Sequence, residues 1–254
     1  MKIRVPSVKP LVVIIPEKQA KGLETIDAGA AYTAFLHSEV GKFKQEPLGK
    51  YVDLISSSIN PGGAHYRDQI FDYVDLREVD EIFGQILLTR RVQGASIGSS
   101  KHRFRRGDIL FAKIMPSLEN KKVAYVVHDV SNGVASTEFL ILRPKVDEDI
   151  NPFYLFRALR SDHFTQQAIA NVTGATGRQR ISPNKLLSLK IIVPPSEVQE
   201  QIGSVVEREF RLRSLAAEET ARANDISFQT LGPTTIRTAQ SKKRRSTRNS
   251  RKKQ

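Results

Sequence analysis

Residues 107–127 read GDILFAKIMPSLENKKVAYVV. Gly107 and Asp108 are turn formers, so we expect the chain to turn there. The apolar run that follows, ILFAKI, is typical of a strand that is buried on both of its faces. The next segment, PSLENKK, is a polar connection, and the run KKVAYVV that overlaps its end predicts a second strand. A buried sheet is therefore expected at the centre of the chain.

Further strands are expected on both sides of this stretch. Residues 71–79 alternate apolar and charged side chains, which is the pattern of a half-buried strand. Residues 136–144, STEFLILRP, predict another strand, and LKIIVPP predicts a last one that two prolines stop. Strands of this kind followed by helices indicate the α+β class.

Helix signals follow the strands. Asn151 can cap a helix that has Pro152 at its first position and continues through residues 153–171, and Ser182-Pro183 opens another short helix. Ser196 and Gln199 match a capping box at the start of a longer helix. Its apolar residues follow an approximate heptad seam, which fits either a coiled coil or one helix packing on its own domain: Val198, Ile202, Val205 and Leu212.

The two ends of the chain have different compositions. Before residue 46 we expect a short strand over Leu11 to Ile15 and a helix over Asp27 to Lys44. From residue 227 onward the chain is polar and basic without periodicity, which predicts disorder. Residues 241–254 carry eight Lys and Arg residues and no acid, and so account for eight of the thirteen excess positive charges.

Composition restricts the possible functions. The absence of cysteine excludes disulfides, thiolate zinc sites and cysteine nucleophiles. No apolar stretch has the length of a membrane span or the layout of a signal peptide, so a cytoplasmic protein is expected. A net charge of +13 favours a polyanionic partner such as nucleic acid, although a basic tail that only aids solubility gives the same balance.

One interpretation of the opening stretch is a metal-dependent nuclease. Asp108, Glu119 and Lys121 supply the carboxylates and the lysine that cleavage with Mg²⁺ uses. Turn formers surround Glu119, however, and such patterns arise by chance in a chain with 27 acidic residues. Catalysis is kept as the alternative to binding.

Other enzyme signatures are weak. The motif NPFY at 151–154 resembles the Asn-Pro-Pro-Phe/Tyr motif of amino-methyltransferases, but it lacks one proline and is explained by the helix cap. The sequence has no glycine-rich phosphate loop and no loop for S-adenosylmethionine. Its five histidines show no ligand spacing, so neither a metal nor a cofactor is expected.

Basic residues gather in the expected loops and strand edges. Arginine and lysine bind phosphates, arginine forks to guanine, and glutamine pairs with adenine, so these positions are candidate DNA contacts. Each cluster read alone also fits a solvated surface. The candidates are Arg178, Gln179, Arg180, Lys101, Arg103, Arg105, Arg90, Arg91, Lys121 and Lys122.

Five segments in order resemble a known family. They are RRGDILFAKIMPSLENKKVAYV, GVASTEFLILRPK, NPFYLFRALRSDHF, TGATGRQRIS and LKIIVPPSEVQEQI. In order and spacing they are similar to a target recognition domain of the DNA-specificity (S) subunits of type I restriction-modification systems. The resemblance extends over residues 48–207.

The resemblance implies a function without catalysis. Members of the family read a split DNA sequence and hold methyltransferase (M) and endonuclease (R) subunits on it. A full-length member has two recognition domains separated by two antiparallel helices, whereas this chain has one domain and one helix. The resemblance therefore implies a half-subunit that forms a homodimer, pairs with another half, or is a truncated remnant.

These expectations combine into one division of the chain. We expect an unassigned segment at 1–45, a DNA target recognition domain at 46–195, a helical spacer or dimerisation segment at 196–226, and a disordered basic tail at 227–254. The expected partner is double-stranded DNA. A protein that only binds partners through its long helix remains a third possibility.

Overall fold

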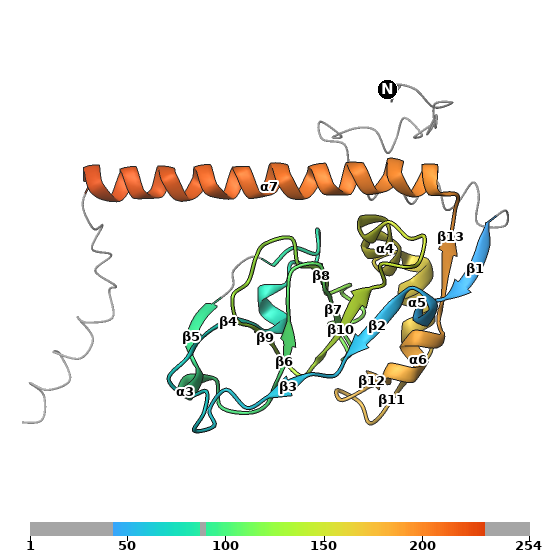
Figure 1. Cartoon of the computed structure of the whole chain (residues 1–254), viewed down its shortest axis with the longest axis horizontal. Coiled ribbons are helices and arrows are strands. Elements are labelled where there is room, and N and C mark those ends of the chain that lie inside the picture. The colour runs from blue at the N-terminus through green and yellow to red at the C-terminus, as the bar shows by residue number, and fades with distance from the viewer. Residues whose placement is uncertain (1–42, 87–89, 232–254) are drawn as a thin grey trace, which may run out of the picture. The chain divides into compact units, whose positions relative to one another are not determined.

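The computed structural model describes residues 43–86 and 90–231, and it has the expected mixture of sheets and helices (Figure 1). The strands are β1 (Lys44–Pro47), β2 (Val52–Ile55), β3 (Ser58–Ile59), β4 (Ile70–Val74), β5 (Arg90–Gln93), β6 (Lys101–Phe104), β7 (Ile109–Ala112), β8 (Val123–Tyr125), β9 (Gly133–Ala135), β10 (Phe139–Pro144), β11 (Val172–Thr173), β12 (Arg180–Ile181) and β13 (Lys190–Val193). The helices are η1 (Leu48–Lys50), η2 (Leu76–Glu78), α3 (Gly94–Ile97), α4 (Pro152–Leu159), α5 (Asp162–Ile169), α6 (Pro183–Ser188) and α7 (Ser196–Leu231).

The sheet predicted at the centre of the chain is antiparallel and has the strand order β2-β10-β7-β8. Its strand β7 is the apolar run ILFA, and all four residues are buried. Successive side chains of a strand point to opposite faces, and here each face has its own core. Ile109 and Phe111 belong to one hydrophobic cluster, and Leu110 and Ala112 to another. The prediction of a strand buried on both faces is confirmed.

A five-stranded sheet with the order β3-β6-β9-β4-β5 covers one face of the central sheet. Val74, Phe104 and Ala135 from three of its strands share a buried cluster with residues of β7, β8 and β10. In this sheet β4 and β9 run parallel, and the other pairs are antiparallel. On the opposite face of the five-stranded sheet, Phe71 and Val134 are fully buried as well.

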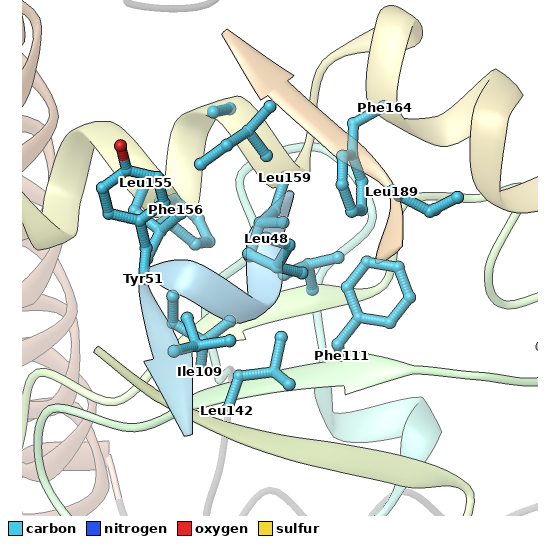
Figure 2. Close-up of a cluster of buried hydrophobic side chains, with 14 of the residues drawn as sticks. Leu48, Tyr51, Ile109, Phe111, Leu142, Leu155, Phe156, Leu159, Phe164 and Leu189 are labelled. Carbon is cyan, nitrogen blue, oxygen red and sulfur yellow. The ribbon is translucent and has the colours of Figure 1, made fainter. Parts of the chain in front are cut away.

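Helices cover the other face of the central sheet. One buried cluster joins the central sheet to α4 and α5 (Figure 2). It contains Ile109, Phe111 and Leu142 of the sheet together with Leu155, Phe156 and Leu159 of α4 and Phe164 of α5. Burial of one such side chain stabilises the fold by about 2 kcal/mol. Asn151 caps α4 by accepting hydrogen bonds from the Phe153 and Tyr154 amides, both at 3.0 Å, as the cap interpretation of NPFY predicted.

Several predicted elements are shorter than expected, among them one strand and one helix. The strand predicted over 71–79 ends at Val74, because Asp75 forms a capping box with Glu78 and starts η2. The helix predicted over 153–171 is broken into α4 and α5. Ser161 makes the break by accepting a hydrogen bond from the Phe164 amide at 3.1 Å, which starts a new helix.

The predicted capping box of α7 is wrong. The Ser196 hydroxyl donates to Asp149 at 2.8 Å, and the buried Gln199 side chain donates to Pro194 O at 3.0 Å. Gln199 also accepts a hydrogen bond from the Asn151 amide at 2.9 Å. These bonds fasten the first turn of α7 to the start of α4 instead of closing a cap within α7.

The terminal predictions fall mostly outside the described residues. The strand over Leu11 to Ile15 and residues 232–254 of the tail predicted at 227–254 lie there, whereas residues 227–231 are helical, so the disorder predicted for them is wrong. The helix predicted up to Lys44 is wrong at its end, since Lys44 begins β1, which pairs with β13. The helical segment expected to stop at 226 continues to Leu231.

The structure divides into two compact units at Phe210 and Arg211. In the first unit, Ile202, Val206 and Phe210 of α7 are buried in the cluster that α4 also joins. In the second unit, α7 continues with exposed Leu212 and Leu215 and with an ion pair between Glu219 and Arg222 at 3.1 Å. Within the described part of the chain, no helix has the length and apolar character needed to cross a membrane.

Candidate nucleic-acid interface

The outer face of the five-stranded sheet holds a row of basic and aromatic side chains. Tyr73 pairs in register with Arg90 on one side and with Val134 on the other, and Val134 pairs with Arg103. Residues in register point to the same face of a sheet, so the four side chains form one row across β5, β4, β9 and β6. Lys101 lies two residues before Arg103 and points to the same side.

Aromatic rings hold the cations of this row. The Arg90 guanidinium lies 4.8 Å from the centre of the Tyr73 ring, and the Lys101 ammonium lies 5.7 Å from it. The Arg103 guanidinium lies 5.7 Å from the ring of Tyr66, which comes from the loop after β3. We call Tyr66, Tyr73, Arg90, Lys101 and Arg103 the sheet-face cluster. Each of the three cations is close enough to a ring centre for a cation–π attraction.

The three cations of the sheet-face cluster differ in the ion pairs and hydrogen bonds that they already make within the domain. Arg90 forms an ion pair with Glu78 at 3.0 Å. Lys101 is buried and donates to Ser99 O, Ser99 Oγ and Ser100 O at 3.0–3.3 Å, and burial lowers its pKa below the usual value. Arg103 is half-buried and donates to Asn132 Oδ1 at 3.3 Å, so its charge meets no carboxylate there.

Three of the predicted contacts are exposed arginines. Arg91 points to the face of the sheet opposite Arg90, and Arg105 follows β6 directly. Arg178 lies in the loop between β11 and β12. Among residues 43–86 and 90–231, none of these three guanidinium groups has an acidic partner. Of the ten predicted contacts, these three leave an exposed guanidinium without an acidic partner in the described part of the chain.

The side chains of two predicted contacts bond to other groups of the same domain. Lys122 donates to Leu76 O at 2.9 Å and to Val79 O at 3.3 Å, and its side chain is only 14% exposed. Lys121 forms an ion pair with Asp162 at 2.6 Å. Both ammonium groups tie the connection after β7 to neighbouring segments.

The segment TGATGRQR forms a small hairpin. β11 and β12 pair antiparallel, and the Arg178 amide donates to Ala175 O at 2.9 Å to close a turn. Gly177, the third residue of that turn, has φ of +77°, which a glycine adopts without strain. Arg178 is exposed and Gln179 is half-buried beside it. The Arg180 guanidinium is bonded to Glu138 through two parallel hydrogen bonds of 2.9 and 2.7 Å.

The nuclease alternative is contradicted by the position of Asp108. Its side chain is fully buried and accepts two hydrogen bonds from Arg143, at 2.7 and 3.0 Å, and one from the Arg105 amide at 2.9 Å. The hydrogen bonds with Asp108 raise the pKa of Arg143. A carboxylate committed in this way cannot reach a phosphate or hold Mg²⁺ beside one. Asp108 therefore fixes the turn into β7.

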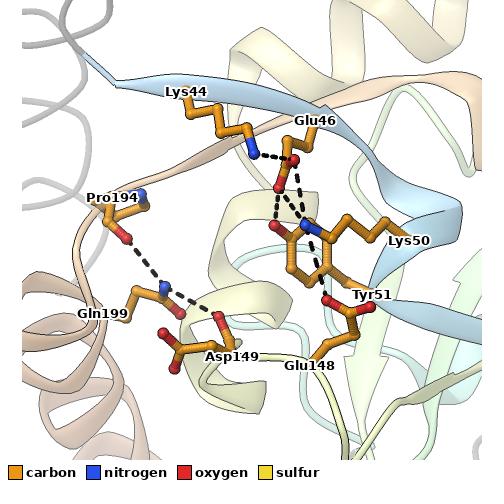
Figure 3. A network of polar contacts seen from close by, with 8 residues as sticks. All are labelled: Lys44, Glu46, Lys50, Tyr51, Glu148, Asp149, Pro194 and Gln199. Carbon is orange, nitrogen blue, oxygen red and sulfur yellow. Dashed lines mark hydrogen bonds and ion pairs between the residues drawn. The ribbon is translucent and has the colours of Figure 1, made fainter.

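A second polar network lies where β1, η1 and the start of α7 meet (Figure 3). Glu46 contacts the Lys44 ammonium and the Tyr51 hydroxyl, and it pairs with Lys50 at 3.0 Å. These contacts, led by Lys44, lower the pKa of Glu46 to about 2. Lys50 also approaches Glu148 at 3.8 Å. Charges here compensate one another, which indicates a structural role.

The residues predicted for a partner helix are divided by the structure. Ile202 is buried in the core of the first unit, and Val198 and Val205 pack against that core. Leu212 is 58% exposed. Of these four residues Leu212 alone is exposed, and the prediction of a partner helix stays a prediction.

Sequence comparison identifies the family of this domain. Residues 86–222 match the model described as the type I restriction modification DNA specificity domain. The chain belongs to this family. The matched residues extend from the segment before β5 through the hairpin and into α7, so they include all ten candidate contacts named from the sequence.

Relatives of this specificity domain are specificity subunits. The chain is 31% identical over 111 residues to the type I restriction enzyme HindI specificity subunit of Haemophilus influenzae, and 36% identical over 101 residues to the EcoAI specificity subunit of Escherichia coli. These matches cover 43% and 39% of this chain but only 23% and 17% of the two relatives.

Solved structures share the fold. The HsdS subunit from Thermoanaerobacter tengcongensis superposes with a TM-score of 0.55 at 24% identity, over 77% of this chain and 51% of that one. The specificity domain thus spans about half the length of this solved subunit, and less of the two curated relatives.

The sequence did not reveal Tyr66, Tyr73, Asn132 or Glu138 as parts of the candidate interface. Tyr73 stood out only as one member of an alternating strand. Its partners on β5 and β6 lie elsewhere in the sequence, and strand pairing of that kind is not encoded by local spacing.

Proposed function

We propose that this chain binds duplex DNA sequence-specifically, as a non-catalytic specificity half-subunit of a type I restriction-modification system. The observation that carries the proposal is that the family match covers β5, β6 and the β11–β12 hairpin. These elements and their flanks hold three exposed arginines, Arg91, Arg105 and Arg178, that meet no acid among the described residues. A polyanion would supply the missing counter-charge.

Phosphate and base contacts fall on different elements in this proposal. Arg103 of the sheet-face cluster and the exposed Arg105 contact phosphates, which position the protein without reading sequence, and Arg91 reaches phosphates only from the other face of the edge strand β5. Arg178 and Gln179 on the hairpin carry the side-chain types that fork to guanine and to adenine. Arg90 and Lys101 lie over Tyr73 on the same face of the sheet as Arg103 and add positive charge there, and Lys121 and Lys122 add further charge from the connection after β7.

Proposed protein partners are the methyltransferase and restriction subunits and a second half-subunit or a second copy of this chain. The relatives named above are specificity subunits of restriction enzymes, and the part of each that this chain matches is less than a quarter. A further fold relative with a TM-score of 0.55 comes from a study of complex assembly of the type I system. The exposed Leu212 and Leu215 on α7 supply an apolar surface for the second half.

Replacing Arg103 by alanine is expected to weaken duplex binding and its salt dependence. One phosphate contact fewer lowers the slope of log Kd against log salt by about one. Fluorescence anisotropy of the full chain on a labelled duplex, repeated at several salt concentrations, measures the slope. Arg208→Ala is the matched control, because Arg208 is exposed on α7 in the first unit and should leave the slope unchanged.

Two outcomes would contradict the proposed function. One is failure of the wild-type chain to bind any duplex at low salt, alone or with its methyltransferase. The other is cleavage of the duplex by the purified chain when Mg²⁺ is added.

A further inference from the structure

Arg180 sits at the base of the hairpin with its whole guanidinium engaged. Nε and Nη2 donate to the two carboxylate oxygens of Glu138 at 2.9 and 2.7 Å, and Nη1 donates to Arg178 O at 2.9 Å. A bidentate pair of this kind fixes the orientation of the guanidinium relative to the carboxylate as well as the distance between them. The hydrogen bonds from Arg180 lower the pKa of Glu138, so the carboxylate is charged at neutral pH.

Glu138 is itself held by the central sheet. It directly precedes β10, and its carbonyl accepts a hydrogen bond from the Lys113 amide at 2.9 Å, just after β7. The Glu138 side chain is 26% exposed and the Arg180 side chain 38%. The carboxylate is therefore anchored by the rigid part of the domain.

Backbone hydrogen bonds hold β12, the second strand of the hairpin, beside the segment that follows β7. The Ile181 amide donates to Lys113 O at 2.9 Å, and the Met115 amide donates to Gln179 O at 3.0 Å. β12 therefore runs beside residues 113–115, while the loop 174–178 extends beyond them and is exposed. Its two glycines, Gly174 and Gly177, have positive φ and add no side chain that could hold the loop in place.

We infer that Glu138 and Arg180 form a strut that sets the direction in which the hairpin presents Arg178 and Gln179 to base edges of duplex DNA. Glu138 is then a positioning residue for specificity, and Arg180 acts through the hairpin backbone and not by touching a base. The inference rests on the proposed function and assigns base reading within it to this hairpin.

The two roles of Arg180 predict opposite results for Glu138→Gln. If Arg180 contacted DNA directly, loss of the neighbouring negative charge would release its guanidinium and strengthen binding. If Arg180 is part of a strut, the neutral amide accepts more weakly and offers one oxygen instead of two, so the hairpin loses its direction. Affinity for the preferred duplex then falls.

The test compares affinities of the full chain for two duplexes. One is the duplex that the wild-type chain enriches from a random pool, and the other is an unrelated duplex of equal length. Glu138→Gln is expected to weaken binding of the preferred duplex about tenfold, the size of one lost base contact, and to change binding of the unrelated one less than about twofold. Glu119→Gln removes the same charge from an exposed turn residue, and should change neither affinity by more than about twofold.

A double variant separates positioning from simple damage. Glu138→Arg combined with Arg180→Glu exchanges the two ends of the strut, and should recover at least part of the preference that each single substitution removes. Melting temperatures within about 2 °C of wild type for Glu138→Gln would show that the domain stays folded. An unchanged or increased preference in Glu138→Gln would overturn the strut, while the proposed function would stand. Failure of the wild-type chain to bind duplex DNA would instead overturn the proposed function.

Discussion

Replacing Asp108 by asparagine is expected to lower the free energy of unfolding by about 3 kcal/mol. The Asp108 carboxylate is fully buried and holds the Arg143 guanidinium at 2.7 and 3.0 Å. Asparagine keeps the shape of the side chain but leaves the Arg143 guanidinium without a counter-charge. The NH2 group of the asparagine also takes the place of a carboxylate oxygen, so one N–H donor then faces another. The turn before β7 then loses the group that fixes it.

Urea unfolding of the purified variants measures this loss. Asp129→Asn is the matched control, because Asp129 pairs with Arg106 at 3.4 Å but its side chain is 87% exposed. We expect the control to change stability by less than about 1 kcal/mol. Equal, small effects of the two substitutions would show that the Asp108 pair does not stabilise the domain.

Replacing Arg160 by methionine is expected to cost a similar amount, about 3 kcal/mol. Arg160 is 3% exposed, and its guanidinium donates to four backbone carbonyls, those of Lys121, Val123, Glu81 and Ile82. Burial lowers its pKa to about 10, which still leaves it charged at neutral pH. Methionine fills part of the volume but leaves buried carbonyls without a donor.

The effect of Arg160→Met should also be local. Hydrogen exchange is expected to speed up in residues 80–86 and 118–123, the two segments that the guanidinium joins. Arg106→Met removes an exposed arginine and should change unfolding by no more than about 0.5 kcal/mol. If Arg160→Met lowered the free energy of unfolding no more than this control does, the four hydrogen bonds to carbonyls would not be what holds the two segments together.

Local signals were sufficient for much of the fold. The apolar run ILFA predicts a strand buried on two faces, and β7 is that strand. Asn151 and Pro152 predict the start of α4 because a cap depends only on residues within one turn. The capping box at Ser196 was wrong for the opposite reason: Gln199 bonds to residues of another segment.

The candidate site was less predictable, because its contacts join distant segments. Asp108 carries the residue type of a metal ligand, and only the partner Arg143 on β10 shows that it is structural. Arg180 has the residue type of a base contact, and only Glu138 shows that its guanidinium is engaged. Exposed Arg178 has no such partner among the described residues, and its prediction as a DNA contact stays a prediction.

Selection from a pool of random duplexes tests the central claim most directly. The whole chain, alone and with the proposed methyltransferase partner, is mixed with the pool at low salt, and the bound duplexes are sequenced. The wild-type chain is expected to enrich one sequence pattern, and the double variant Arg178→Ala with Gln179→Ala is expected to lose preference at part of that pattern. Recovery of the pool without enrichment, from a chain that is folded, would contradict sequence-specific recognition by this domain.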